Sequence, residues 1–145
     1  MQPDTADAAG LTLTSWTELG CTVGALSGEL GTASAPRLRE QLLGLLDPAA
    51  SRIVIDLSAV SHADASGLAV LVGTGRRAVM LGGFLRLAAP GPAVADALRI
   101  TGLDQQLDIF PTAQAAIAGP AQGRRRTPPA SFAASWSPDP DAPPE

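Results

Sequence analysis

The sequence contains no lysine, so all ten of its basic residues are arginine. This absence excludes a P-loop lysine, a lysine Schiff base and the strand lysine of protein kinases. Acidic residues outnumber arginines, and the net charge of -4 provides no basic surface for the phosphates of nucleic acid. We therefore expect no nucleic-acid partner.

Cysteine and histidine each occur once. Cys21 cannot form an internal disulfide, and neither a base nor a metal-ligand spacing surrounds it, so we interpret it as a small apolar core residue. His62 would have to be the base of any serine hydrolase built on Ser66, and residues 64–68, D-A-S-G-L, lack the G-x-S-x-G pattern of a nucleophile elbow. A small hydrolase is therefore an unfavoured alternative, and we expect no metal or cofactor.

No apolar run is long enough to cross a membrane. The longest run is interrupted by Arg76 and Arg77, short of the roughly 20 residues that a membrane-spanning helix needs. The first ten residues, MQPDTADAAG, have neither the basic nor the apolar region of a signal peptide. We expect a cytoplasmic protein without membrane contact.

The composition divides the 145 residues into three segments. Residues 1–10 are predicted to be a short flexible lead, and residues 11–118 a single folded domain. Seven of the thirteen prolines fall within residues 119–145, which predicts a disordered tail. Phe132 and Trp136 are two aromatic residues in this tail that could form a docking motif.

Strand-like and helix-like segments alternate within the folded domain. Alternating or continuous apolar runs predict strands at 11–16, 21–28, 52–57, 84–89 and 106–110. Helical spacing predicts helices at 32–46, from 65 to the pair Gly82 and Gly83, at 92–101 and at 112–118. This alternation predicts an α/β fold with a mostly parallel sheet of four to five strands and about four helices.

The segment GTGRRA, residues 73–78, has the spacing of a dinucleotide-binding loop. Such a loop follows a strand, whereas here apolar residues at helical spacing precede the glycines. We interpret the glycines as small residues that pack a helix against the sheet. The buried stripe of that helix is predicted to comprise Leu68, Leu71, Val72, Gly75 and Val79.

The start of the long helix contains the serine that most needs an explanation. Asp64 is a suitable N-cap residue and Ser66 falls in the first turn, where both residue types favour helix initiation. Ser34, followed by Pro36, supplies a similar start for the preceding helix. From the residues alone, Ser66 can be a structural residue or a site of modification.

Five short motifs follow one another along the chain: GEL after the second predicted strand, IDLS ending the third, D-x-S-G-L opening the long helix, GG before the fourth strand and TGLD before the fifth. In this order they resemble the STAS domain family, specifically the bacterial anti-sigma factor antagonists, over residues 11–118. The resemblance implies a (βα) superhelix whose first strand is antiparallel, and no catalytic site. It also implies that Ser66 is the position at which such proteins are phosphorylated.

The resemblance further implies a partner-switching role in transcription regulation and stress response. The unphosphorylated protein would bind a GHKL-type protein that is both anti-sigma factor and serine kinase, thereby releasing the sigma factor. Phosphorylation would end binding, and a PP2C-type phosphatase would reverse it; the protein itself would be a monomer or weak dimer. The partner-binding region carried over consists of Glu29, Asp56, Ser58, His62, Asp64, Ala65, Gly67 and Leu68.

Two positions depart from the family pattern. Gly31 stands where an acidic residue often follows GEL, and Ala65 stands where a hydroxyl residue often precedes the modified serine. Ser66 is therefore the only hydroxyl residue of this segment. An alternative function is a STAS regulatory subunit of a membrane transport system, in which Ser66 would serve only to start the helix.

Overall fold

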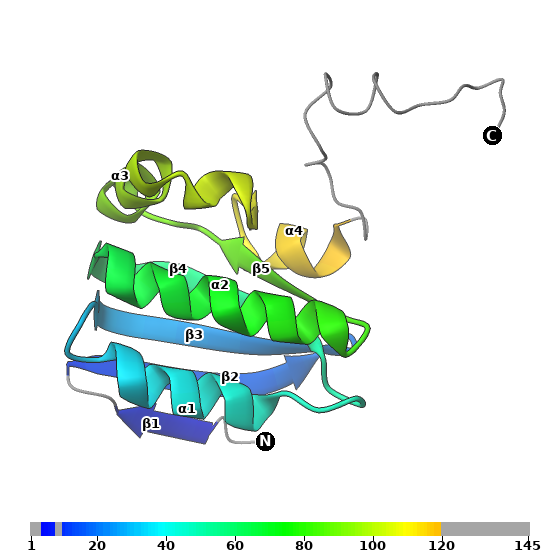
Figure 1. The fold of residues 1–145 in the computed structure, drawn as a ribbon. Helices are drawn as coiled ribbons and strands as arrows, with labels where there is room; N and C mark the ends of the chain where they lie inside the picture. The colour runs from blue at the N-terminus through cyan, green and yellow to red at the C-terminus, as the bar shows by residue number, and fades with distance from the viewer. Residues whose placement is uncertain (1–3, 8–9, 120–145) are drawn as a thin grey trace, which may run out of the picture.

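The computed structural model describes residues 4–7 and 10–119, which form one mixed sheet with helices on both faces (Figure 1). Its six strands lie in sequence order, and the first three, β1 (Asp4–Asp7), β2 (Leu11–Glu18) and β3 (Cys21–Leu30), are antiparallel. The other three, β4 (Arg52–Ala63), β5 (Phe84–Ala88) and β6 (Asp108–Phe110), continue from β3 in parallel. The predicted α/β fold is confirmed.

The sheet has one strand more than the four to five predicted. The additional strand, β1, lies within the segment 1–10 that the sequence analysis treats as a lead, and it pairs with β2. The boundaries at residues 10 and 118 stay predictions. Of the predicted tail, residues 120–145 lie outside the described residues.

Four α-helices connect or follow the strands of the described chain: α1 (Ala35–Leu45), α2 (Ala65–Met80), α3 (Pro92–Thr101) and α4 (Ala113–Ala118). A short 3-10 turn, η1 (Leu103–Gln105), follows α3. Figure 1 shows α1 and α2 side by side in front of the sheet. No helix among residues 4–7 and 10–119 has both the length and the apolar character to cross a membrane.

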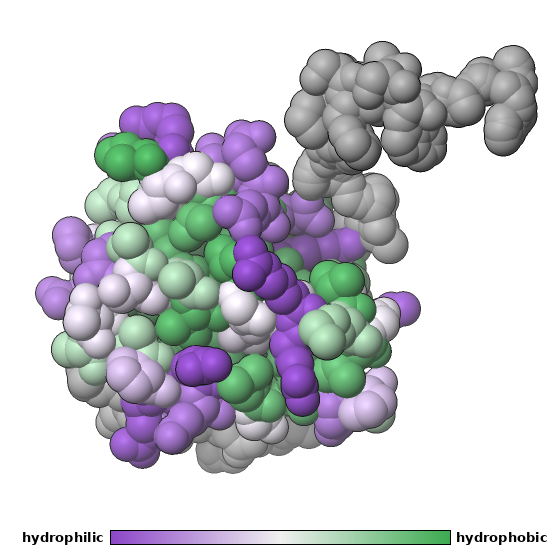
Figure 2. All heavy atoms as spheres, in the orientation of Figure 1, coloured by the Kyte–Doolittle hydropathy of each residue, from purple (hydrophilic) through white to green (hydrophobic). Residues whose placement is uncertain are grey.

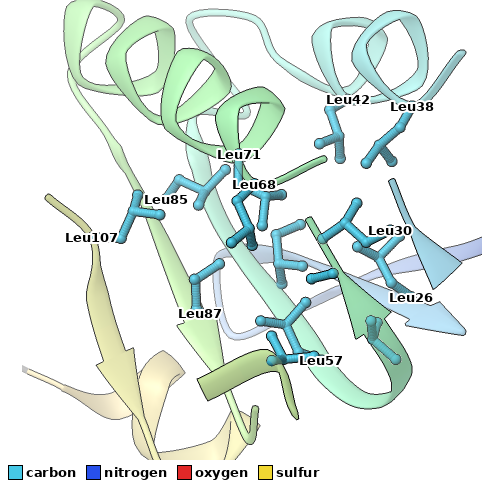
Figure 3. Packing of buried hydrophobic residues seen from close by; sticks show 14 of the residues in the cluster. Leu26, Leu30, Leu38, Leu42, Leu57, Leu68, Leu71, Leu85, Leu87 and Leu107 are labelled. Atoms are coloured by element: carbon cyan, nitrogen blue, oxygen red, sulfur yellow. The ribbon is translucent and has the colours of Figure 1, made fainter. Parts of the chain in front are cut away.

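The main core lies between the sheet and helices α1, α2 and α3. Leu68 and Leu71 of α2 are fully buried and point toward the sheet leucines, among them Leu30 and Leu57 (Figure 3). The predicted stripe was wrong at its end, because Val79 is 63% exposed whereas Ala78 is buried. The helix period of 3.6 residues brings position 78, rather than 79, back to the sheet.

The two glycines of GTGRRA lie inside α2, as the helix-packing interpretation predicted, but only one of them packs. A Cβ atom on Gly75 would lie 3.5 Å from side-chain atoms of both Leu85 and Leu107. A Cβ atom on Gly73 would meet nothing within 4 Å. The packing interpretation is therefore confirmed for Gly75 and wrong for Gly73.

Strand β4 extends beyond the predicted residues 52–57 to Ala63, so that it includes His62. Its register with β3 shifts twice, between the partners of Ala25 and Ser27 and again between those of Gly28 and Glu29. As a result every third residue from Leu57 to Ala63 is buried, a spacing that does not resemble a strand. Two bulges therefore concealed the second half of β4 from pattern analysis.

The opposite face of the sheet is covered by α4 around a smaller cluster that contains Cys21, Val54 and Ala116. Cys21 is buried, as predicted, and burial raises the pKa of its thiol. A buried arginine, Arg86 of β5, was not foreseen on this face. Its guanidinium stacks 3.8 Å from the ring centre of Phe84.

Arg86 also binds the carboxyl end of α4. Its Nη1 donates hydrogen bonds to the carbonyl oxygens of Ala116, at 2.7 Å, and Gly119, at 3.1 Å. Carbonyl groups at a helix end lack partners within the helix, and a cation compensates their partial negative charge. Arg86 therefore attaches the last helix of the described chain to the sheet.

We expect Arg86→Met to lower the free energy of unfolding by about 2 kcal/mol or more, because it leaves buried carbonyl groups without a donor. Arg86→Lys should recover only part of the loss, since an ammonium group cannot stack on Phe84 as a guanidinium does. Urea denaturation measures both. Arg52→Met, at an exposed arginine of the adjacent strand, is the control and should change stability by less than about 0.5 kcal/mol.

Candidate functional site

The candidate site is the first turn of α2, which lies against the carboxyl end of β3. The backbone N–H of Asp64 donates to the carbonyl oxygen of Leu30 at 3.0 Å, and the backbone of Gly67 passes over the same carbonyl group. A Cβ atom on Gly67 would lie 2.5 Å from that oxygen, closer than real Cβ atoms come. Only glycine therefore allows the helix to start at this position.

The Asp64 carboxylate links the helix to the segment after β3. Its Oδ1 accepts a hydrogen bond from the backbone N–H of Gly67 at 3.0 Å, which confirms Asp64 as the N-cap of α2. Its Oδ2 accepts from the backbone N–H of Thr32 at 3.2 Å and from the Thr32 hydroxyl at 3.4 Å. One side chain thus joins segments 32 residues apart in the sequence.

These hydrogen bonds favour the ionised carboxylate. The N–H of Gly67 contributes most to lowering the pKa of Asp64 below its ordinary value of 3.8, and desolvation opposes it. The N–H and hydroxyl of Thr32 and the N–H of Ser66 lower this pKa further. Asp64 is therefore a fixed negative charge beside the serine at neutral pH.

The turn between β3 and α1 is held by Ser34. The buried Ser34 hydroxyl donates to the carbonyl oxygen of Glu29 at 3.1 Å and accepts from the N–H of Gly31 at 3.1 Å. A Cβ atom on Gly31 would lie 3.0 Å from Asp64 Oδ2. The absence of a side chain at Gly31 thus makes room for the Asp64 carboxylate.

Ser66 is exposed in this rigid turn. Among the described residues, no side chain forms a hydrogen bond with its hydroxyl, and His62 in particular does not. The serine is therefore presented to solvent in a fixed position without a base to activate it. This arrangement suits a hydroxyl group on which another protein acts.

The structure brings some predicted site residues together and separates others. Ala65 and Ser66 are exposed side by side on the first turn, whereas Gly67 and Leu68 are buried and serve packing. Glu29 and His62 are both exposed, and they lie opposite each other in the register of β3 and β4, near the ends of these strands. This end of the sheet and the start of α2 therefore expose polar groups at one edge.

Asp56 lies away from this edge. It pairs with Ala25 of β3, whereas Ala63, next to Asp64, pairs with Leu30, so about 16 Å of strand separates the two positions. Its neighbour in register on β5 is Ala88, a member of the cluster under α4, so it lies on the sheet face opposite α2. Its Oδ1 accepts from the N–H of Ser58 at 2.9 Å, which supports the first bulge of β4.

Sequence reasoning did not identify Thr32 and Ser34 as parts of the site. Both lie in the segment GELGTAS, but their roles depend on contacts with Asp64 and with the backbone of β3. A serine or threonine near a helix start predicts a cap, and Ser34 does precede α1, yet its side chain makes no capping bond there. Its partners were visible only in the folded chain.

Comparisons with known proteins agree with this geometry. The sequence profile of the STAS domain matches residues 17–116. An anti-sigma-B factor antagonist from Bacillus subtilis (strain 168) is 38% identical over 84 residues, which cover 58% of this chain and 76% of that protein.

Solved structures of similar fold include two other antagonists. The crystal structure of an anti-sigma factor antagonist from Mycobacterium paratuberculosis has a TM-score of 0.68 and 28% identity, covering 77% of this chain and 95% of that one. The Bacillus cell fate determinant SpoIIAA, solved in its phosphorylated form, has a TM-score of 0.55 and 20% identity, covering 71% of this chain and 95% of that one. The second likeness shows the fold alone.

We expect Asp64→Ala to lower the melting temperature by roughly 5 °C, because it removes the cap and the link to Thr32. Asp64→Asn should lie between wild type and the alanine variant, since its amide oxygen can still accept from Gly67 but its NH₂ group opposes a donor at Thr32. An unchanged melting temperature for Asp64→Ala would contradict the role of Asp64 as a link.

The difference between wild type and Asp64→Asn should depend on pH. Because folding lowers the pKa of Asp64, its stabilisation is complete above the unfolded value and is lost as the pH falls through the folded value. The melting temperatures of wild type and Asp64→Asn should therefore differ above about pH 4 and become equal in stronger acid. A difference that stays constant over this range would show that the charge of Asp64 is unimportant.

Two alanine substitutions in α2 should have opposite effects. Gly67→Ala should lower the free energy of unfolding by about 2 kcal/mol or more, because the new methyl group meets the Leu30 carbonyl. Gly73→Ala, on the same helix but facing open space, should raise it by up to about 1 kcal/mol through helix propensity. Equal changes in urea denaturation would refute the close contact at Gly67.

Proposed function

The chain belongs to the STAS domain family, and we propose that it is an anti-sigma factor antagonist switched off by phosphorylation at Ser66. The observation that carries this proposal is an exposed serine, without a base, in the first turn of a helix fixed by Asp64 and Gly67. Identity of 38% to an anti-sigma-B factor antagonist supports the role. The partner is then an anti-sigma factor that is also a serine kinase of the GHKL type.

A serine that is a substrate needs exposure and a defined position rather than a base of its own. The kinase supplies the base and the metal-bound nucleotide, and the substrate contributes a hydroxyl held in line with the transferred phosphoryl group. Asp64 fixes the backbone on the amino side of Ser66, and buried Gly67 and Leu68 fix it on the other side. The protein itself catalyses no reaction.

Phosphorylation changes the surface far more than the fold. A phosphate adds about -1.5 to -2 charges, and the Asp64 carboxylate already accepts the hydrogen bond of Gly67 at this helix end. The arginines of α2, Arg76 and Arg77, begin ten residues further along, about 15 Å away. The phosphate therefore adds to an existing negative charge with no arginine of α2 near it, and a partner that fits the neutral serine is repelled.

The proposal also includes a contact surface, a phosphatase and a place of binding. Glu29, Ser58, His62 and Ala65 are exposed and belong to the surface that the anti-sigma factor would contact, together with Asp64. A PP2C-type phosphatase would restore the hydroxyl of Ser66. Binding would take place in the cytoplasm, by a monomer or weak dimer, and would require neither nucleic acid nor membrane.

We expect Ser66→Ala to bind the partner kinase at least as tightly as wild type and to act as a permanent antagonist. Ser66→Asp should bind at least 30-fold more weakly, a loss of roughly 2 to 4 kcal/mol, because it places a second carboxylate beside Asp64 in the contact. Isothermal titration calorimetry measures both affinities. Gln114→Asp, which adds a negative charge at an exposed residue of α4 on the opposite face of the sheet, is the control and should bind like wild type.

The melting curves of the same variants separate a surface effect from unfolding. Ser66→Asp should melt within a few degrees of wild type, because negative charge in the first turn of a helix is mildly favourable. Equal affinities for Ser66→Ala and Ser66→Asp would refute the phosphorylation switch. Incubation with the kinase and ATP should place phosphate on Ser66 by mass spectrometry, and copurification of a transporter ATPase instead would favour the alternative function.

A further inference from the structure

An open groove of about 430 Å³ lies between α1 and α2 on the outer side of the helix layer. Its lining comprises Arg39 and Leu43 of α1 and Ala69, Val70, Gly73, Thr74 and Arg77 of α2. Gly73 adds no side chain to this lining, and a Cβ atom there would meet nothing within 4 Å. Figure 2 shows apolar surface on this face of the molecule between strongly hydrophilic residues.

The two helices that form the groove are basic in an acidic protein. They carry four arginines, Arg37, Arg39, Arg76 and Arg77, and a single acid, Glu40, although the net charge of the chain is -4. Arg39 and Arg77 form no ion pair with an acidic side chain within the described residues. The groove therefore suits a segment that combines apolar side chains with carboxylates.

We propose that residues 132–141 of the same chain bind in this groove. This segment, FAASWSPDPD, places Phe132 and Trp136 four residues apart and follows them with Asp139 and Asp141. The aromatic rings would occupy the space above Gly73, and the two carboxylates would pair with Arg39 and Arg77. A segment whose composition cannot form a core of its own can still bind through a few aromatic anchors on a preformed surface.

The chain is long enough for this contact. The segment begins beyond Gly119, which lies at the end of α4 on the face of the sheet opposite the groove. Seventeen residues lead from there to Trp136 and span up to about 60 Å when fully extended, which is enough for the path of roughly 55 Å around half the circumference of a body about 35 Å across. Because the segment is tethered, its effective concentration is in the millimolar range, and modest affinity gives substantial occupancy.

Occupancy of the groove would affect the surface beside Ser66. Ala69 and Val70 lie three and four residues after Ser66, on the adjacent turn of α2. A bound segment would therefore cover part of the helix face that a partner approaches. This consequence rests on the proposed function, whereas the binding of the segment does not.

Fluorescence of the full chain tests the contact without any partner. The chain has two tryptophans, so Trp16→Phe leaves Trp136 as the only emitter. We expect acrylamide to quench Trp136 at least twofold less in this chain than in a free peptide of residues 127–145. Gly73→Leu, which fills the groove, and the pair Arg39→Glu with Arg77→Glu, which reverses its charge, should each raise quenching to the level of the peptide.

Matched variants on the same helices control for unrelated effects. Gly44→Leu adds the same side chain at a glycine of α1, where a Cβ atom would likewise meet nothing within 4 Å. Arg37→Glu combined with Arg76→Glu makes the same charge change at two arginines outside the groove lining. Both should leave Trp136 protected, and melting curves should show that every variant is folded. If Gly73→Leu fails to fold, the charge-reversal pair decides.

Three results would overturn the proposal. Quenching of Trp136 equal to that of the peptide would show no contact, and protection that persists in both groove variants would place the contact elsewhere. Protection that rises with protein concentration would indicate a second copy of the chain as the partner. None of these results would alter the affinities of the Ser66 variants for the kinase, so a failure here is distinguishable from a failure of the proposed function.

Discussion

The structure depends on the close contact between the first turn of α2 and the carbonyl group of Leu30. That carbonyl accepts the N–H of Asp64, and the absence of a side chain at Gly67 allows the helix backbone to pass directly over it. From this point the direction of α2 is set, and Leu68 and Leu71 are brought against the sheet. The position of Ser66 follows from the same contact, because it lies between the cap and the glycine.

The contact explains why a rigid residue can be so exposed. A side chain in a loop is accessible but has no defined position, whereas a side chain in a core has a defined position but is inaccessible. Ser66 points outward from a turn whose neighbours, Asp64 and Gly67, are held by hydrogen bonds and close packing. Its place in the sequence, between a cap and an obligatory glycine, therefore gives the serine both exposure and a defined position.

Much of the fold could be predicted from the sequence, because most elements are specified by their own residues. The helix 92–101 ends at Gly102, which has a φ of +77°, as its sequence pattern indicated. The second half of β4 was missed because its two bulges depend on pairing with β3 and on the Asp56 carboxylate. Within the candidate site, the role of Asp64 as a cap was predictable from its neighbours in the sequence. Its hydrogen bond to Thr32 was not predictable, because that contact forms only in the folded chain, and the same holds for the burial of Arg86.

The side of α1 and α2 that faces the sheet and the side that faces solvent differ in their roles. The inner sides of α1 and α2 carry the leucines that determine stability, and their outer sides carry Ser66 and the arginines, whose charge has little effect on the fold. A modification on the outer side can therefore change binding while the structure persists. Asp64 is the exception, because the same carboxylate caps the helix and supplies the negative charge beside Ser66. A change at Asp64 alters stability and charge together, and only substitutions at Ser66 itself isolate the effect of charge on recognition.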